Sequence, residues 1–378
     1  MKKYRIRIVM AFGLESLTKW QLEKMGYEDF TVNNGYIELE GTAEDIIKLN
    51  IHLRTADRVY IVLKEFKADS FEDLFQGVQE IEWGKWMAED ANFIVNGKAH
   101  QAKLFSIRDC QSIIEKAMIG KMKEIYPIDW FPKTGSRYKI RFRNHKDRTI
   151  LMVDTSGEGL HKRGYRIESG RAPLRENLAS ALVELSFYQR DRFFVDLFCG
   201  SGTIAIEAAR FARNIAPGID RDFDCVHWSK EWQKIYKKER AKAMDAIDYG
   251  GKLHILASDI DGGIVRRAIE NAESAGVRED IDFITRDFRQ IALSDDYGVL
   301  ITNPPYGDRF MDKKKAEEIL LDLGEKMKQL NTWSWYILTD EKKLESLIGK
   351  KANRKRKLFN GPIETTFYQY YGPRPPKK

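Results

Sequence analysis

The stretch FFVDLFCGSGTIAIEAARFA at 193–212 most restricts the folds available to this chain. A short apolar strand ends at Asp196, a turn with two glycines follows, and a helical run begins near Thr203. Downstream, helical segments alternate with the apolar strands LHILASD, VLITN and SWYILTD, which predicts a parallel sheet covered by helices. The last stretch, LFNGPIETTFYQYYG, predicts a closing antiparallel hairpin through Asn360-Gly361.

The N-terminal part of the chain lacks this regular alternation. Its helical and strand-like runs fall into two small groups, which predicts two α+β modules ahead of the helix-covered sheet. A chain of 378 residues is also longer than most single domains. We therefore predict three domains, with a first module over 1–65, a second over 66–160 and an α/β domain over 161–378.

Cysteine content and hydropathy restrict where the protein acts. Only Cys110, Cys199 and Cys225 occur, outside any C-x-x-C pair, so neither a disulfide framework nor a zinc site is expected. Arg5 and Arg7 interrupt the apolar stretch near the N-terminus, which argues against a signal peptide. No run approaches the roughly 18 apolar residues of a membrane span. These features predict a cytoplasmic protein that binds neither a membrane nor a metal.

The glycine turn is suited to a ligand that approaches the backbone. Gly200 and Gly202 carry no side chain at the open end of the strand, and Asp196 could hold a cationic or hydroxylated group there. The pattern D-x-F-x-G-x-G has neither the G-x-G-x-x-G spacing of dinucleotide sites nor the G-x-x-x-x-G-K-[ST] of a P-loop. A tight strand-to-helix turn without a ligand is the alternative.

Two further strands end in acids. Asp259 is the first acid after LHILAS, and a carboxylate in this position can accept two hydrogen bonds from a ribose diol. Asp261 could share that contact or simply cap the next helix. The strand IDFIT is followed by Asp287 and Phe288, which suit an adenine amino group and ring face. For Asp287, an ordinary helix cap is again the alternative.

The segment LITNPPYGDR at 300–309 ends another strand in a rigid corner, because proline has a constrained φ angle and no N–H to donate. Taken together, DLFCGSGT, SDID, RDF and NPPY resemble the motifs of class I S-adenosylmethionine-dependent methyltransferases. The segment HKRGYRIESGRAPLRENLASALV is similar to the one that precedes this fold in RlmL-type 23S rRNA guanine-N2 methyltransferases. The first 160 residues resemble the ferredoxin-like and THUMP modules of the same enzymes.

This resemblance implies a Rossmann-like methyltransferase domain over 161–378, a ferredoxin-like domain over 1–65 and a THUMP-like RNA-binding domain over 66–160. It implies S-adenosyl-L-methionine as the cofactor. The implied cofactor-binding residues are Asp196, Phe198, Gly200, Gly202, Thr203, Asp259, Ile260, Asp287 and Phe288. The implied catalytic residues are Asn303, Pro304, Pro305 and Tyr306.

The NPPY corner suits methylation of an exocyclic amine. Such an amine is a poor nucleophile because its lone pair is delocalised, so the enzyme must hold its hydrogens and aim the nitrogen at the methyl group. The side-chain oxygen of Asn303 and the backbone carbonyl of Pro304 can supply two acceptors, and Tyr306 can stack on the base. A proline-rich turn that merely ends the strand is the alternative. The corner alone does not choose among adenine N6, guanine N2 and a glutamine amide.

The stretch between Gly202 and Asp259 is far longer than the roughly 20 residues expected between a glycine turn and its acid. Proteins similar to the RlmL type carry an insertion here. In this chain it is predicted to be helical, with Trp228, Trp232 and Tyr236 at intervals of four residues. We expect this stripe to pack against the protein, and contact with RNA is the alternative.

A basic strand indicates where nucleic acid binds. In SRYKIRFRNHKDR, the side chains of one strand face are cationic, namely Arg137, Lys139, Arg141 and Arg143. One basic strand face could simply be exposed to water without binding a polyanion. Two more basic runs, HKRGYR and KKANRKRK, occur on a chain whose net charge is only +7, and this asymmetry favours a surface that binds phosphates.

The preferred hypothesis is therefore an RNA methyltransferase that acts on guanine N2, with large-subunit (23S) rRNA as substrate. A tRNA substrate, an N6-adenine DNA methyltransferase and an inactive RNA-binding homologue are the alternatives. The intact NPPY and strand-end acids argue against an inactive protein. Pyrimidine C5 methylation requires a nucleophilic cysteine near the base, and no cysteine lies in a matching motif. The sequence does not identify the target nucleotide, the oligomeric state or any protein partner.

Overall fold

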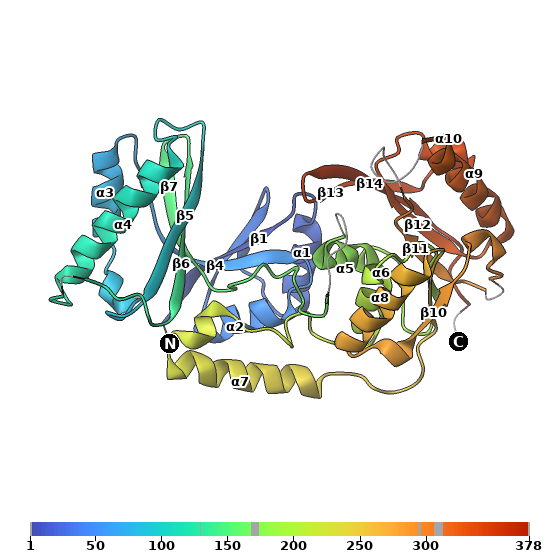
Figure 1. Cartoon of the computed structure of the whole chain (residues 1–378), viewed down its shortest axis with the longest axis horizontal. Coiled ribbons are helices and arrows are strands. Elements are labelled where there is room, and N and C mark those ends of the chain that lie inside the picture. Colours follow the sequence, from blue (N-terminus) through green and yellow to red (C-terminus); the bar gives the residue numbers. More distant parts are fainter. Residues whose placement is uncertain (1, 129, 168–173, 294–295, 306–312, 377–378) are drawn as a thin grey trace.

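The computed structural model describes residues 2–128, 130–167, 174–293, 296–305 and 313–376. Two seven-stranded sheets, one in each half of the chain, form two lobes that stand side by side in Figure 1. The long helix α7 (Lys230–Asp245) packs against α2 (Ala43–His52) beneath the N-terminal lobe in this view. The part of the chain inserted after the glycine turn therefore lies against the N-terminal half of the protein.

The N-terminal sheet has the strand order β2-β3-β1-β4-β7-β6-β5. Its strands are β1 (Tyr4–Met10), β2 (Phe30–Asn33), β3 (Tyr36–Gly41), β4 (Ala56–Lys67), β5 (Asn92–His100), β6 (Arg137–His145) and β7 (Arg148–Asp154). The accompanying helices are α1 (Glu15–Lys24), α2, α3 (Phe71–Gln79) and α4 (Ile107–Lys123). Alternating residues of β1, namely Ile6, Ile8 and Met10, are buried in the core, as the alternation in the sequence predicts.

Strand β4 joins the two predicted N-terminal modules into one sheet. Residues 56–61 pair with β1, while residues 60–67 pair with β7, so the two partners meet staggered halves of the same strand. The boundary predicted between 65 and 66 falls inside this strand. The two modules are thus continuous through backbone hydrogen bonds, which the sequence pattern does not reveal.

The C-terminal sheet has the order β10-β9-β8-β11-β12-β14-β13. Its first five strands pair in parallel, and the last two form an antiparallel hairpin. The strands are β8 (Phe194–Asp196), β9 (Ile255–Asp259), β10 (Ile281–Thr285), β11 (Val299–Thr302), β12 (Ser334–Thr339), β13 (Arg354–Asn360) and β14 (Ile363–Tyr370). The Rossmann-like sheet and its closing hairpin are confirmed.

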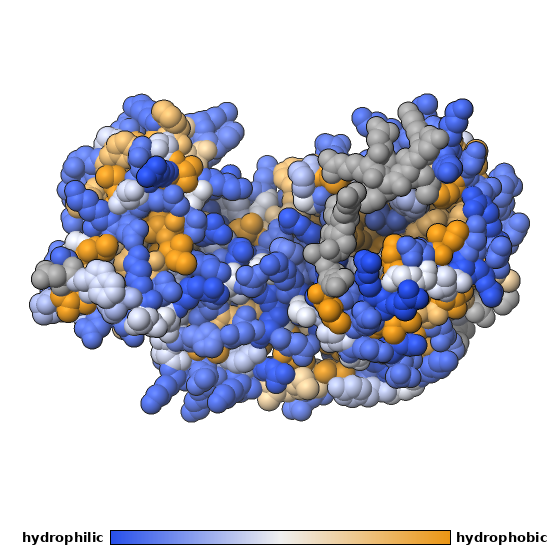
Figure 2. Space-filling view, in the orientation of Figure 1, coloured by the Kyte–Doolittle hydropathy of each residue, from blue (hydrophilic) through white to orange (hydrophobic). Residues whose placement is uncertain are grey.

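Besides α7, the helices of this half are α5 (Glu176–Glu184), α6 (Thr203–Ala212), α8 (Gly262–Ser274), α9 (Lys313–Gln329) and α10 (Leu344–Ile348). Every residue of β8, β11 and β12 is buried, because parallel strands covered by helices lose contact with water on both faces. No helix in the described ranges is both long enough and apolar enough to cross a membrane. The face seen in Figure 2 is largely hydrophilic, with hydrophobic residues in scattered groups.

Candidate active site

The predicted residues meet where the strand order of the C-terminal sheet reverses. From β8 the chain continues to β9 and β10 on one side, and then returns to β11 and β12 on the other. Open α/β sheets bind ligands at such a point, beyond the carboxyl ends of the strands. Asp196 ends β8, Asp259 ends β9, and Asn303 follows β11 directly. The structure thus brings three separate sequence motifs to one edge.

Asp196 is fully buried and only half satisfied. Its Oδ1 accepts hydrogen bonds from the Thr302 hydroxyl at 2.8 Å and from the Phe198 N–H at 3.2 Å. Its Oδ2 has no hydrogen-bond partner among the residues that the structure describes. Burial, with a smaller contribution from the nearby charge of Asp259, raises the pKa of this carboxyl to about 7. An unpaired buried carboxylate oxygen is costly, so the site is suited to a ligand that donates a hydrogen bond.

The two glycines of the turn serve different purposes. Gly200 has φ +50°, and a Cβ placed on it would meet no atom of the described residues within 4 Å, so open space adjoins its backbone there. Gly202 has φ +83°, and a Cβ there would lie 3.1 Å from the Cβ of Ala268 in α8. Gly200 leaves room for a ligand, whereas Gly202 permits close packing where α6 begins. The hydroxyl of Thr203, the first residue of α6, accepts a hydrogen bond from Arg166 at 3.1 Å.

Two acids lie at and just beyond the end of β9 and have different partners. Asp259 is half-buried and accepts hydrogen bonds from the N–H groups of Gly200 and Asp261, each at 3.1 Å. Asp261 caps α8 by accepting from the N–H groups of Gly263 and Ile264. Between the two acids, the side chain of Ile260 is 71% exposed. Asp259 therefore connects the glycine turn to the end of β9, and Ile260 offers an apolar surface beside it.

After β10, Phe288 does not present its ring as expected for an adenine contact. Asp287 caps a short 3₁₀ turn and holds the Arg289 guanidinium at 2.9 Å. Phe288 is only 5% exposed, and its ring packs against Phe198 with 4.9 Å between the ring centroids. Phe288 thus supports Phe198, which is the more exposed of the two rings. A ring that follows a strand end can turn either inward or outward, so the sequence alone could not show this.

The proline corner holds a second unpaired acceptor. Asn303 is half-buried, and its Oδ1 is shielded from solvent without a hydrogen-bond partner among the described residues. Pro304 is buried and Pro305 is half-buried. Tyr306, predicted to stack on the base, lies outside the described residues. Sequence reasoning missed Thr302, whose hydroxyl connects this corner to Asp196, because a threonine that ends a buried strand is ordinary.

The four cations predicted to bind RNA share one face of β6, but they have different surroundings. Arg137 donates two hydrogen bonds to Oδ1 of Asp224, at 2.7 and 3.1 Å, and Lys139 lies 3.6 Å from the same carboxylate. Asp224 belongs to the 3₁₀ turn η2 (Asp224–His227), which precedes α7. Arg143 is exposed and has no ion pair within the described ranges. Arg137 and Lys139 therefore hold the inserted segment, and Arg143 is free to meet a phosphate.

The aromatic stripe of the insertion packs as expected. Trp232 is 8% exposed, with its ring 6.2 Å from Tyr4 of β1 and 5.4 Å from Trp228. The Tyr236 hydroxyl donates a hydrogen bond to the carbonyl of Arg221 at 2.7 Å. Trp228 lines a cavity beside Tyr138. The insertion therefore packs its aromatic side chains against the N-terminal lobe.

Models of known families match almost the whole chain. The RMKL-like methyltransferase domain matches residues 163–369, the RlmL ferredoxin-like domain matches 5–60, and the THUMP domain matches 68–154. YpsC of Bacillus subtilis (strain 168), a candidate RNA methyltransferase by name, is 42% identical over 100% of this chain and 99% of its own length. The ribosomal RNA large subunit methyltransferase K/L of Psychromonas ingrahamii is 32% identical over 96% of this chain, which spans only 49% of that protein.

Solved structures agree with these matches. SMU.472, described as a candidate methyltransferase complexed with SAH, is 37% identical and has a TM-score of 0.95, with 100% of both chains covered. A protein of Listeria monocytogenes, described as a predicted N6-adenine-specific DNA methylase, is 39% identical with a TM-score of 0.93, over 99% of this chain and 97% of that one. The chain belongs to the RMKL-like methyltransferase family, and it carries an RlmL ferredoxin-like domain and a THUMP domain ahead of the methyltransferase domain.

Proposed function

We propose that this protein transfers a methyl group from S-adenosylmethionine to the exocyclic N2 amine of a guanine in RNA, with large-subunit rRNA as the substrate. One observation carries the proposal. Oδ2 of Asp196 and Oδ1 of Asn303 are buried acceptors that have no partner among the described residues, and they lie at the ends of the neighbouring strands β8 and β11. Thr302, which precedes Asn303, donates its hydroxyl to the other oxygen of Asp196. One acceptor suits a cofactor that donates hydrogen bonds, and the other suits an amine.

The residues around Asp196 fit S-adenosylmethionine. The open space at Gly200 and the unpaired Oδ2 of Asp196 would receive its amino-acid part, while Asp259 would accept hydrogen bonds from the ribose. The exposed Ile260 and the Phe198 ring would contact the adenine. SMU.472, which matches this chain over 100% of both chains, was solved with SAH, the product of this cofactor. When bound, the cofactor supplies an electrophilic methyl group.

Asn303 would then position the nucleophile. Its unpaired Oδ1 would accept a hydrogen from the target amine, and the Pro304 carbonyl would accept the other. Two acceptors orient the nitrogen lone pair toward the methyl group and stabilise the positive charge that develops on nitrogen. We propose that Tyr306 stacks on the base. The constrained corner after β11 favours the holding of an amine by acceptors, because neither proline adds a competing N–H donor.

The choice of RNA rests on the N-terminal half and on the relatives. The THUMP match, the free Arg143 on β6 and the RNA-related names of the two curated relatives support an RNA substrate. The name of the Psychromonas protein, of which this chain spans about half, supports large-subunit rRNA. A protein that modifies rRNA or its precursors would act in the cytoplasm, and we propose that location.

Nucleoside analysis tests the proposal. The purified protein is incubated with S-adenosylmethionine and, separately, with rRNA, tRNA and duplex DNA from a strain that lacks the gene, and the methylated nucleosides are identified by mass spectrometry. We expect N2-methylguanosine in 23S rRNA, and we expect the Asn303→Ala protein to form it about a hundredfold more slowly. If N2-methylguanosine forms in tRNA alone, the proposed substrate is wrong and the proposed reaction is right. N6-methyladenine in DNA, the activity in the Listeria description, would refute the proposal.

A further inference from the structure

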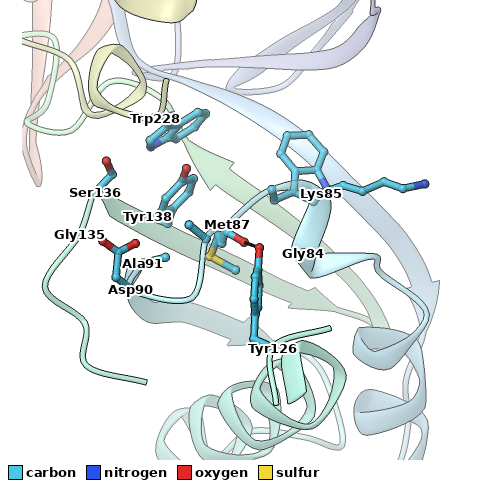
Figure 3. Close-up of a pocket in the computed structure, with 12 residues that line it drawn as sticks. Gly84, Lys85, Met87, Asp90, Ala91, Tyr126, Gly135, Ser136, Tyr138 and Trp228 are labelled. Atoms are coloured by element: carbon cyan, nitrogen blue, oxygen red, sulfur yellow. Dashed lines mark hydrogen bonds between the residues drawn. The ribbon is translucent and has the colours of Figure 1, made fainter. Parts of the chain in front are cut away.

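A cavity of about 370 Å³ lies at the junction of the THUMP-like module and the insertion, away from the strand ends that form the candidate active site. Figure 3 shows its lining, with Tyr138 and Trp228 on one side, the segment of Gly84 and Lys85 on the other, and Tyr126 at a third side. Its volume falls in the range of small-molecule sites, about 300–1,000 Å³. We propose that this cavity binds an unpaired guanine of the RNA substrate, other than the base that is methylated.

The aromatic lining is held rigidly. The rings of Tyr138 and Trp228 stack with 4.9 Å between centroids and 11° between planes. The indole N–H of Trp228 donates to the carbonyl of Arg137 at 3.0 Å, and the Tyr126 hydroxyl donates to the carbonyl of Met87 at 3.1 Å. Rings that are already oriented lose little entropy when a base packs on them, and unpaired RNA bases are commonly recognised by such stacking.

Asp90 supplies a free acceptor at this cavity. Its side chain is exposed and has no hydrogen bond or ion pair with any residue that the structure describes. A Cβ on Gly135 would lie 2.6 Å from the Asp90 carboxylate, so the glycine leaves room for this side chain. In Figure 3 the two residues lie together below Ser136 and Tyr138. Tyr138 is only 5% exposed and backs Trp228, so the half-buried Trp228 ring would supply the stacking surface, beside a carboxylate that has no partner in the described ranges.

The carboxylate determines which base fits. Two carboxylate oxygens accept two parallel hydrogen bonds, and among the four RNA bases only guanine presents two adjacent donors, N1–H and the N2 amine, on its Watson–Crick edge. A phosphate would be repelled by Asp90. The ammonium group of Lys2 lies 4.5 Å from the ring of Trp86, which lines the cavity, and can meet a phosphate next to the base, whereas the exposed Lys85 is paired with Glu82 at 2.6 Å. A guanidinium from a peptide is the competing occupant, and the test includes it.

The inference rests on the proposed RNA function, and binding of short RNAs to the full chain tests it. The dissociation constants of fluorescein-labelled rUUGUU and rUUUUU are measured by anisotropy for the wild type, Asp90→Asn and Glu89→Gln. Glu89 is the matched control, because it is exposed, adjacent and equally charged but does not line the cavity. We expect the wild type and Glu89→Gln to prefer rUUGUU by about tenfold, and Asp90→Asn to lose that preference.

Three results would overturn the inference: equal binding of both RNAs by the wild type, a preference that survives in Asp90→Asn, or displacement of rUUGUU by N-acetylargininamide but not by guanosine. Because Asp90 is exposed, thermal unfolding of its variant should match the wild type. Methyl transfer to rRNA is measured in parallel. If the protein methylates rRNA but its preference for rUUGUU does not depend on Asp90, only the assignment of the cavity is wrong. If it methylates no RNA, the proposed function is wrong.

Discussion

Replacing Thr302 by valine tests how the candidate active site holds its acid. The Thr302 hydroxyl donates to Oδ1 of Asp196 at 2.8 Å, and neither residue has exposed surface. Valine keeps the shape but removes the donor, so the ionised form of Asp196 loses stabilisation while the packing stays almost unchanged. The substitution should therefore raise the pKa of Asp196 further above its ordinary value.

The size of the effect follows from the hydrogen bond. A bond to a charged group contributes about 1.5–3 kcal/mol, which would move the Asp196 pKa from about 7 to about 8–9. If the cofactor requires the ionised carboxylate, the competent fraction at pH 7.5 falls from about three-quarters to about one-quarter or less. S-adenosylhomocysteine should then bind roughly 3- to 25-fold more weakly at pH 7.5, and the loss should shrink as the pH rises.

The affinity for S-adenosylhomocysteine is measured by calorimetry between pH 6 and 9. In the wild type, affinity should rise with pH up to about 7 and then level off, because deprotonation completes the acceptor. In Thr302→Val, the midpoint should lie one to two pH units higher, by about the shift worked out above. Thr149→Val is the control, since Thr149 is also fully buried but its hydroxyl has no partner in the described structure. A wild-type midpoint and affinity in Thr302→Val would refute the reasoning.

Three other substitutions separate the steps. Asn303→Ala should lower the single-turnover methylation rate about a hundredfold, because one preorganised acceptor is lost, while S-adenosylhomocysteine affinity by calorimetry stays near wild type; an unchanged rate would contradict the amine-orienting role. Asp259→Ala should weaken calorimetric binding of the same ligand by about 1–3 kcal/mol, and equal affinity would remove Asp259 from the cofactor site. Arg143→Gln should reduce the slope of log K against log salt for RNA by about 0.9 (duplex) or 0.7 (single strand), and an unchanged slope would show that this side chain meets only water.

The sequence predicted the strand ends well because parallel strands place their carboxyl ends on one edge. Once β8, β9 and β11 were recognised as strands, the positions of Asp196, Asp259 and Asn303 followed. The partners of these residues could not be predicted. That Thr302 faces Asp196 depends on how the two strands are aligned, which no local pattern specifies.

Long-range pairing explains the other differences. The sequence predicts one uniform basic face on β6, because the alternation of side chains along a strand is visible in the sequence. Asp224, the partner of Arg137, lies 87 residues away in an insertion whose placement depends on the packing of Trp232 against Tyr4. The inward turn of Phe288 has the same origin, since only the position of Phe198 decides it.

The shared strand β4 determines how the N-terminal half can be taken apart. A fragment that begins at residue 66 would sever β4 and leave β7 without most of its neighbour, exposing a row of unpaired backbone groups that invites aggregation. The THUMP-like part of this protein is thus not a cassette that can be excised. Residues 1–160 should melt as one cooperative block, and only fragments that keep this block whole should be compared with the full chain for RNA binding.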